Sequence, residues 1–78
     1  MYYVYILLCS DNSYYVGYTK NIKSRIINHN KSESFSTSYR LPVITKWVGI
    51  FNNKQNAIKF EKYLKTGSGN AFFKKRLI

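Results

Sequence analysis

The chain has 78 residues, enough for one hydrophobic core, and we predict a single domain over residues 1–78. It carries 13 lysine and arginine residues against 3 acidic ones, a formal net charge of +10, and this density of charge attracts polyanions such as nucleic-acid backbones. A single cysteine excludes an internal disulfide, and no apolar run approaches the ~20 residues of a membrane span. We therefore expect a cytoplasmic protein that binds nucleic acid and has no membrane partner.

The first half of the chain contains two expected strands and a helix. Tyr2–Leu8 and Tyr14–Thr19 are aromatic and β-branched runs separated by turn-forming residues, which predicts a β-hairpin. Asn21 suits the N-cap of a helix that extends to about Asn30 along a stripe of isoleucines. The Ser-rich segment Lys31–Ser38 has no periodicity and is expected to be an exposed loop.

The second half contains one expected strand and two helices. Lys46–Phe51 has the composition of a strand. A helix then begins at a cap, either Asn52 or Asn53, and ends near Gly67, a residue typical of the position after a helix. A short third helix is expected from about Asn70 to Leu77. The order strand-strand-helix-strand-helix-helix predicts an α+β fold with a small three-stranded sheet, at least partly antiparallel, flanked by helices.

Glu61 is an acid placed beside the apolar stripe of the second helix. At 3.6 residues per turn, it falls about 40° from Ala57 and about 60° from Leu64. One interpretation is a surface ion pair with Lys65, worth about 0.2–0.5 kcal/mol. The other is a ligand for a hard divalent cation, which prefers carboxylate oxygen. The other acids lie in an expected turn and an expected loop, so a second metal would lack its usual cluster of carboxylates.

Arg25 and His29 lie four residues apart and therefore share one face of the first helix. An arginine there can stabilise the charge of a phosphate, and a histidine can accept or relay a proton near neutral pH. The alternative for His29 is a core histidine with a satisfied hydrogen bond, because it projects at the border of the apolar stripe. The presence of Arg25 one turn away adds weight to the functional interpretation, and both interpretations of His29 stay open.

The tyrosines of the hairpin are candidates whose arrangement depends on the turn. If the loop has an odd number of residues, Tyr5, Tyr15 and Gly17 share one face of the sheet, whereas a two-residue turn would separate the tyrosines. Gly17 weakens a strand interior, and such a glycine often marks the close approach of a ligand or of backbone. The register stays open at this point.

These residues form an ordered set along the chain: Tyr3-Val4-Tyr5, Tyr15-Val16-Gly17, Arg25, His29, Glu61 and Asn70. The set resembles the GIY-YIG nuclease superfamily, specifically its small single-domain bacterial members, over essentially the whole chain. The resemblance implies an endonuclease that hydrolyses phosphodiester bonds of DNA with one divalent cation, Mg²⁺ or Mn²⁺. The chain departs from the pattern at Tyr3 and Val4 of the first triplet, and at Tyr18, where some relatives carry lysine.

The resemblance implies catalytic roles for five side chains, Tyr5, Tyr15, Arg25, His29 and Glu61, and supporting roles for Gly17 and Asn70. Glu61 would bind the metal, and Arg25 would contact the phosphate and stabilise charge in the transition state. A tyrosine, either Tyr5 or Tyr15, would orient or deprotonate the attacking water with the help of His29. The choice between the two tyrosines stays open.

Basic residues spread along the chain are expected to bind the phosphate backbone with little sequence preference. They are Lys20, Lys23, Lys31, Arg40, Lys74, Lys75 and Arg76. No separate DNA-binding module is apparent, so a protein partner for targeting is compatible with the sequence. The alternative function is a non-catalytic nucleic-acid-binding module, in which Glu61 is only a salt-bridge partner.

Overall fold

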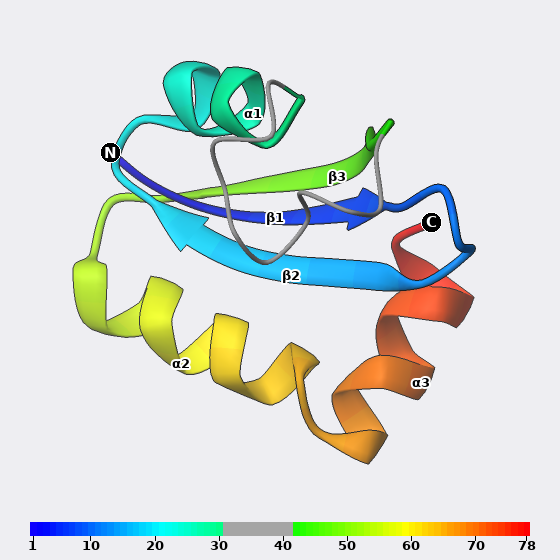
Figure 1. Ribbon diagram of the computed structural model, residues 1–78. Coiled ribbons are helices and arrows are strands. Elements are labelled where there is room, and N and C mark those ends of the chain that lie inside the picture. Colours follow the sequence, from blue (N-terminus) through cyan, green and yellow to red (C-terminus); the bar gives the residue numbers. More distant parts are fainter. Residues whose placement is uncertain (31–41) are drawn as a thin grey trace.

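The computed structural model describes residues 1–30 and 42–78, with the backbone alone for His29 and Asn30. Within these residues, one antiparallel sheet has the strand order β2-β1-β3, with β1 (Tyr2–Leu8), β2 (Tyr14–Thr19) and β3 (Ile44–Phe51). The helices are α1 (Ile22–Asn30), α2 (Lys54–Leu64) and α3 (Gly67–Arg76) (Figure 1). The predicted α+β class and element order are confirmed. No helix in the described ranges has the length and apolar character needed to cross a membrane.

The hairpin register places the two candidate tyrosines on the same face of the sheet. Residues 9–13, an odd number, connect the last pair, Leu8 and Tyr14, and Tyr5 lies opposite Gly17. The turn is closed by a 2.8 Å hydrogen bond from the Cys9 N–H to the Ser13 carbonyl. Asn12 adopts a left-handed conformation with φ 66°, which asparagine tolerates better than most residues.

One face of the sheet packs against α2 and α3, which lie together below it in Figure 1. Val4 and Ile6 of β1 meet Ala57 and Leu64 of α2 and Phe73 of α3 in one hydrophobic cluster. All five side chains are fully buried. This cluster holds the two C-terminal helices onto the sheet, because burial of each large apolar side chain contributes about 1.5–3 kcal/mol.

The opposite face of the sheet packs against α1, which lies above it in Figure 1. Tyr5 and Leu7 of β1 are fully buried in this second cluster, and Ile22 and Ile26 of α1 pack against it. The strand β1 is therefore covered on both faces, which explains why it is almost continuously hydrophobic rather than alternating. It also means that Tyr5 is a core residue as well as a site candidate.

The strand β3 begins two residues before the expected Lys46, at Ile44. Ile44 and Thr45 pair with the end of β1, while Ile6 pairs with Trp47, so Lys46 is the extra residue of a β-bulge. Hydrogen bonding to β1 extends β3 through the polar residues Thr45 and Lys46. Amino-acid composition does not predict this extension.

Asparagine side chains cap the first two helices. The Ser24 N–H donates to Asn21 Oδ1 at 3.2 Å, and the Asn56 N–H donates to Asn53 Oδ1 at 3.1 Å. The expected cap at Asn21 is confirmed, and of the two candidates for α2 the cap is Asn53. The expected loop at Lys31–Ser38 lies outside the described residues.

The predicted end of the second helix near Gly67 is confirmed, but Gly67 is not the residue that terminates it. The helix α2 ends at a C-cap, Lys65, in right-handed conformation, and Gly67 is the first residue of α3. The Thr66 hydroxyl caps α3 by accepting a 3.0 Å hydrogen bond from the Gly69 N–H. This cap starts the helix three residues before the expected Asn70, because a threonine N-cap stabilises a first turn that contains two glycines.

The core role of α3 can be tested with two adjacent phenylalanines. Phe73 is fully buried and meets Tyr14 edge-on at 5.5 Å, whereas Phe72 is 37% exposed. We expect Phe73→Ala to lower the free energy of unfolding by about 3–5 kcal/mol, because the cavity left behind is only partly filled. Phe72→Ala should cost less than about 1.5 kcal/mol. Urea denaturation of both variants measures the difference, and equal losses would contradict the packing of α3.

Candidate active site

The ring of Tyr5 lies across Gly17 on the neighbouring strand. A Cβ at position 17 would overlap Cζ and Oη of Tyr5. The absence of a side chain there lets a ring anchored on the central strand reach over the edge strand β2, and so places the Tyr5 hydroxyl at the border of the sheet. The sequence predicted the close approach of a ligand or of backbone at Gly17, and the group that approaches is instead the Tyr5 side chain.

Three other predicted site residues act on the Tyr5 hydroxyl. The Tyr15 ring lies 6.3 Å from the Tyr5 ring, centroid to centroid. The Arg25 guanidinium donates a hydrogen bond to the hydroxyl, and the Glu61 carboxylate acts on it electrostatically. Arg25 comes from α1 and Glu61 from α2, which cover opposite faces of the sheet (Figure 1). The hydroxyl that both residues influence lies over Gly17 of the edge strand β2.

Burial raises the pKa of the Tyr5 hydroxyl from the ordinary 10.0 to about 12. The neighbouring Tyr15 phenol raises this pKa as well, and so does the negative charge of Glu61. The hydrogen bond and the positive charge of Arg25 act in the opposite direction and lower the pKa. At neutral pH the free protein therefore holds Tyr5 as a neutral phenol, which can donate or accept a hydrogen bond.

Glu61 forms the ion pair that the sequence suggested as one of its two interpretations. Lys65 Nζ lies 2.9 Å from Glu61 Oε2, and the Glu61 side chain keeps 18% of its surface exposed. Pairs of this i,i+4 kind contribute about 0.3–0.5 kcal/mol. Such a weak pair leaves the carboxylate available to a competing cation.

Two predicted site residues are not connected to Tyr5 by the described contacts. His29 belongs to α1, but its side chain lies outside the described part of the structure, and its role stays a prediction. Asn70 lies in the first turn of α3, where its N–H donates to the Thr66 carbonyl at 2.8 Å. Its supporting role also stays a prediction.

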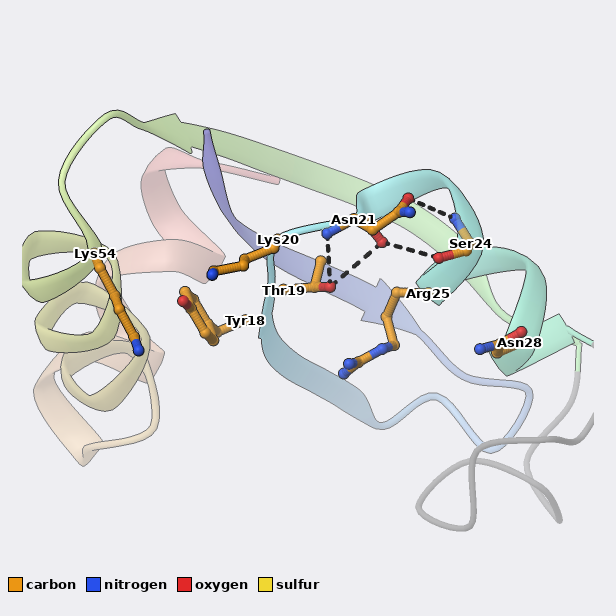
Figure 2. A pocket seen from close by; sticks show the side chains of 8 residues that line it. All are labelled: Tyr18, Thr19, Lys20, Asn21, Ser24, Arg25, Asn28 and Lys54. Carbon is orange, nitrogen blue, oxygen red and sulfur yellow. Dashed lines mark hydrogen bonds between the residues drawn. The ribbon is translucent and has the colours of Figure 1, made fainter.

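A hollow of about 470 Å³ opens beside Arg25 at the end of β2, and Figure 2 shows its lining. We call it the β2 hollow. It is lined by Tyr18, Thr19, Lys20, Asn21, Ser24, Arg25, Asn28 and Lys54. Sequence reasoning singled out Lys20 and Arg25 but missed Lys54, which lies far away along the chain. A signal existed, because a lysine in the first turn of a helix stands where acidic residues are preferred.

None of the other basic candidates within the described residues lines the β2 hollow. Lys23 is exposed on α1, and Lys31 and Arg40 lie outside the described residues. The basic tail Lys74–Arg76 forms the last turn of α3, and Lys74 Nζ lies 5.9 Å from the ring of Tyr14, at the start of β2 rather than its end. These cations stabilise the C-terminal end of a helix. They are therefore separated from the β2 hollow by the length of a strand.

The geometry can be compared with known proteins. The family model described as the GIY-YIG catalytic domain matches residues 1–76. The chain belongs to the GIY-YIG family. This is a family of nucleases, and the tyrosines, Gly17, Arg25 and Glu61 are among the residues on which the resemblance was based, together with His29 and Asn70.

Relatives of the chain share the same small domain. It is 42% identical over 67 residues to a UPF0213 protein of Staphylococcus haemolyticus, which covers 85% of this chain and 82% of the relative. It is 44% identical over 62 residues to a UPF0213 protein of Bacillus cereus, covering 78% of this chain and 65% of the relative. The solution structure of a UPF0213 protein from Bacillus halodurans has a TM-score of 0.62 at 30% identity, covering 96% of this chain and 84% of that one. These names identify a family and state no activity.

The contact between Tyr5 and Gly17 can be tested by adding one methyl group. Gly17→Ala should lower the free energy of unfolding by about 1–3 kcal/mol, because the Tyr5 ring must move from a well-packed position. Gly67→Ala is the matched control, since a Cβ there meets no atom within 4 Å. The control should be neutral or stabilising by less than about 1 kcal/mol. Thermal unfolding compares them, and a neutral Gly17→Ala would contradict the contact.

The raised pKa of Tyr5 predicts a specific loss of stability at alkaline pH. The folded-state pKa of about 12 exceeds the ordinary 10.0, so the contribution of Tyr5 is fully present below pH 10 and is lost as the pH rises toward 12. Urea midpoints measured from pH 8 to 12 should fall more steeply for the natural chain than for Tyr5→Phe. Parallel curves would show that Tyr5 ionises as it does in the unfolded chain.

Proposed function

We propose that this protein is a metal-dependent endonuclease that hydrolyses phosphodiester bonds of DNA with one divalent cation. The observation that carries the proposal is that a guanidinium from α1 and a carboxylate from α2 both influence the pKa of the Tyr5 hydroxyl. A neutral hydrogen-bonding group, a cation for the phosphate and an acid for a metal are the parts that phosphodiester hydrolysis requires.

The residues present fit a metal site that the substrate completes. In residues 1–30 and 42–78, no three His, Cys, Asp or Glu side chains gather to form a cage for an ion. Mg²⁺ commonly binds through one or two carboxylates together with water and substrate phosphates, and the partly exposed Glu61 can supply such a carboxylate. When bound there, Mg²⁺ or Mn²⁺ supplies Lewis-acid stabilisation to the phosphate and the leaving oxygen.

Arg25 is suited to hold the scissile phosphate. The guanidinium has five N–H donors, of which the hydrogen bond to Tyr5 uses only part. The residue is exposed and lines the β2 hollow, and Figure 2 shows its guanidinium directed toward β2. It would stabilise the negative charge that develops on the phosphoryl oxygens, and its bond to Tyr5 would keep that hydroxyl beside the same phosphate.

Either tyrosine can orient the attacking water. For Tyr5 to accept a proton at neutral pH, its pKa must fall from about 12, because an efficient base has a pKa near the working pH. The positive charges of Arg25 and of a bound cation both act in that direction. His29 would assist the proton transfer from the same helix as Arg25.

The alternative, a nucleic-acid-binding module without catalysis, is favoured by one observation. The ion pair between Glu61 and Lys65 gives the carboxylate a purely structural partner. In that case the net charge of +10 would serve binding alone. The two functions are distinguished by whether the natural chain cleaves DNA, and separate replacement of Glu61 and Lys65 then tests whether the carboxylate acts through the metal or through its ion pair.

The test uses purified protein with labelled single-stranded, duplex and branched DNA in Mg²⁺, Mn²⁺ or EDTA. We expect cleavage only with a divalent cation. Glu61→Gln keeps the size of the side chain and should abolish cleavage, and Arg25→Ala should slow it by about 10²–10³-fold. Lys65→Ala is the control, since it removes the partner of Glu61 and should retain cleavage without needing more metal.

Urea denaturation of each variant shows whether loss of cleavage reflects loss of the fold. If Glu61→Gln and Lys65→Ala lose cleavage equally, the carboxylate acts through its ion pair and the metal role is wrong. If the natural chain binds every DNA and cleaves none in either metal, the non-catalytic module is the better description.

A further inference from the structure

The β2 hollow lies at the N-termini of two helices. Asn21, the cap of α1, and Ser24 in its first turn line one side, and Lys54, the first residue of α2, lines the other. The first turn of neither helix contains an acidic residue. In Figure 1 both helices begin at the same end of the sheet, where β2 ends. Two partial positive charges are thus directed at one place without a compensating carboxylate.

The side chains of the hollow add to this positive potential. Lys20, Arg25 and Lys54 line it, and none of the other lining residues is acidic. A lysine at the first position of a helix is disfavoured by the helix dipole, so Lys54 has no structural advantage there. Positive charges that gather without an acid are offset when an anion binds, and helix N-termini commonly bind phosphate.

Tyr18 supplies a second, independent observation. Its hydroxyl is buried and has no hydrogen-bond partner among the described residues, which destabilises the free protein. The ring is held by stacking on Tyr2 at 6.4 Å, and Lys20 Nζ lies 5.8 Å from the Tyr2 ring. Figure 2 shows the Tyr18 ring between the side chains of Lys20 and Lys54. When the flexible side chains of Lys20 and Lys54 turn toward a ligand, an oxygen of that ligand can enter and accept a hydrogen bond from the Tyr18 hydroxyl.

We propose that the β2 hollow binds a second phosphate of the strand whose scissile phosphate contacts Arg25. The inference rests on the proposed function for the identity of the strand. Arg25 connects the candidate active site with the β2 hollow, because it is hydrogen-bonded to Tyr5 and also lines the hollow. A nucleic-acid strand that passes Arg25 continues between the N-termini of the two helices. There the ammonium group of Lys54 pairs with the second phosphate, and the Tyr18 hydroxyl donates a hydrogen bond to the same phosphate.

Binding is measured in EDTA by fluorescence anisotropy of labelled duplex DNA at several salt concentrations, so that cleavage plays no part. Lys54→Ala should reduce the slope of log Kobs against log salt by about 0.9, the share of one phosphate. Lys46→Ala is the matched control, because it removes the same charge from an exposed residue of β3, at the other edge of the sheet. An unchanged slope in Lys54→Ala, or an equal reduction in Lys46→Ala, would overturn the proposal.

Tyr18→Phe separates a ligand contact from a structural role. Removal of an unpartnered buried hydroxyl should raise the urea midpoint of the free protein, while DNA binding weakens by about 10-fold with an unchanged salt slope. A variant that gains stability and binds as tightly as the natural chain would exclude the hydroxyl from the site.

The phosphate itself is located by replacing single phosphates of the DNA with neutral methylphosphonates. A methylphosphonate at one position beyond the scissile phosphate should weaken the binding of DNA to the natural chain. The same methylphosphonate should not weaken DNA binding to Lys54→Ala any further. Equal effects on both proteins, together with Lys54-dependent competition by inorganic phosphate, would indicate a site for free phosphate and overturn the proposal. The binding assay needs no metal, so it tests the second phosphate site separately from cleavage. The proposed function can therefore fail in the cleavage assay while the dependence of the methylphosphonate effect on Lys54 is still seen, and the reverse.

Discussion

The ring of Tyr5 can reach the border of the sheet only because position 17 carries no side chain. This single steric constraint joins the core of the protein to its candidate site. The ring fills the cluster beneath α1, while its hydroxyl meets Arg25 and is within electrostatic reach of Glu61. A residue with both tasks has little freedom to move, because any shift of the ring disturbs the packing around it.

The position of β2 at the edge of the sheet decides which residues can cooperate. If the site lay over a central strand, the strands on either side would keep residues from the helices on the two faces of the sheet apart. The strand β2 lies at an edge, residues from the starts of α1 and α2 line the hollow at its end, and one basic and one acidic residue from these helices influence the pKa of one hydroxyl. The candidate catalytic groups and the candidate phosphate site are thus two parts of one edge.

The local features of the sequence predicted the elements well. The strands follow from aromatic and β-branched runs, and Asn21 and Asn53 mark helix starts through a side-chain oxygen that accepts from the backbone. Gly67 misled because glycine suits both the end of one helix and a tight connection to the next, and the hydroxyl of Thr66 decided between them.

Features that depend on three-dimensional packing were beyond the sequence. The register of the hairpin depends on a turn in which Asn12 takes a left-handed conformation. The raised pKa of Tyr5 depends on burial by α1, and the place of Lys54 in the hollow depends on the path of the chain between α1 and α2. The sequence singled out Glu61, but a periodic pattern alone could not separate its ion pair from a metal role.

The strand β1 has a further property that concerns motion. It is hydrogen-bonded to a neighbour on each side and covered on each face by one of the two hydrophobic clusters. Hydrogen exchange of its amides should therefore require unfolding of the whole domain, whereas α1, at the surface, should open locally. The hydroxyl of Tyr5 is therefore a fixed reference point, and adjustment to different substrates falls to the arginine and the lysines around it.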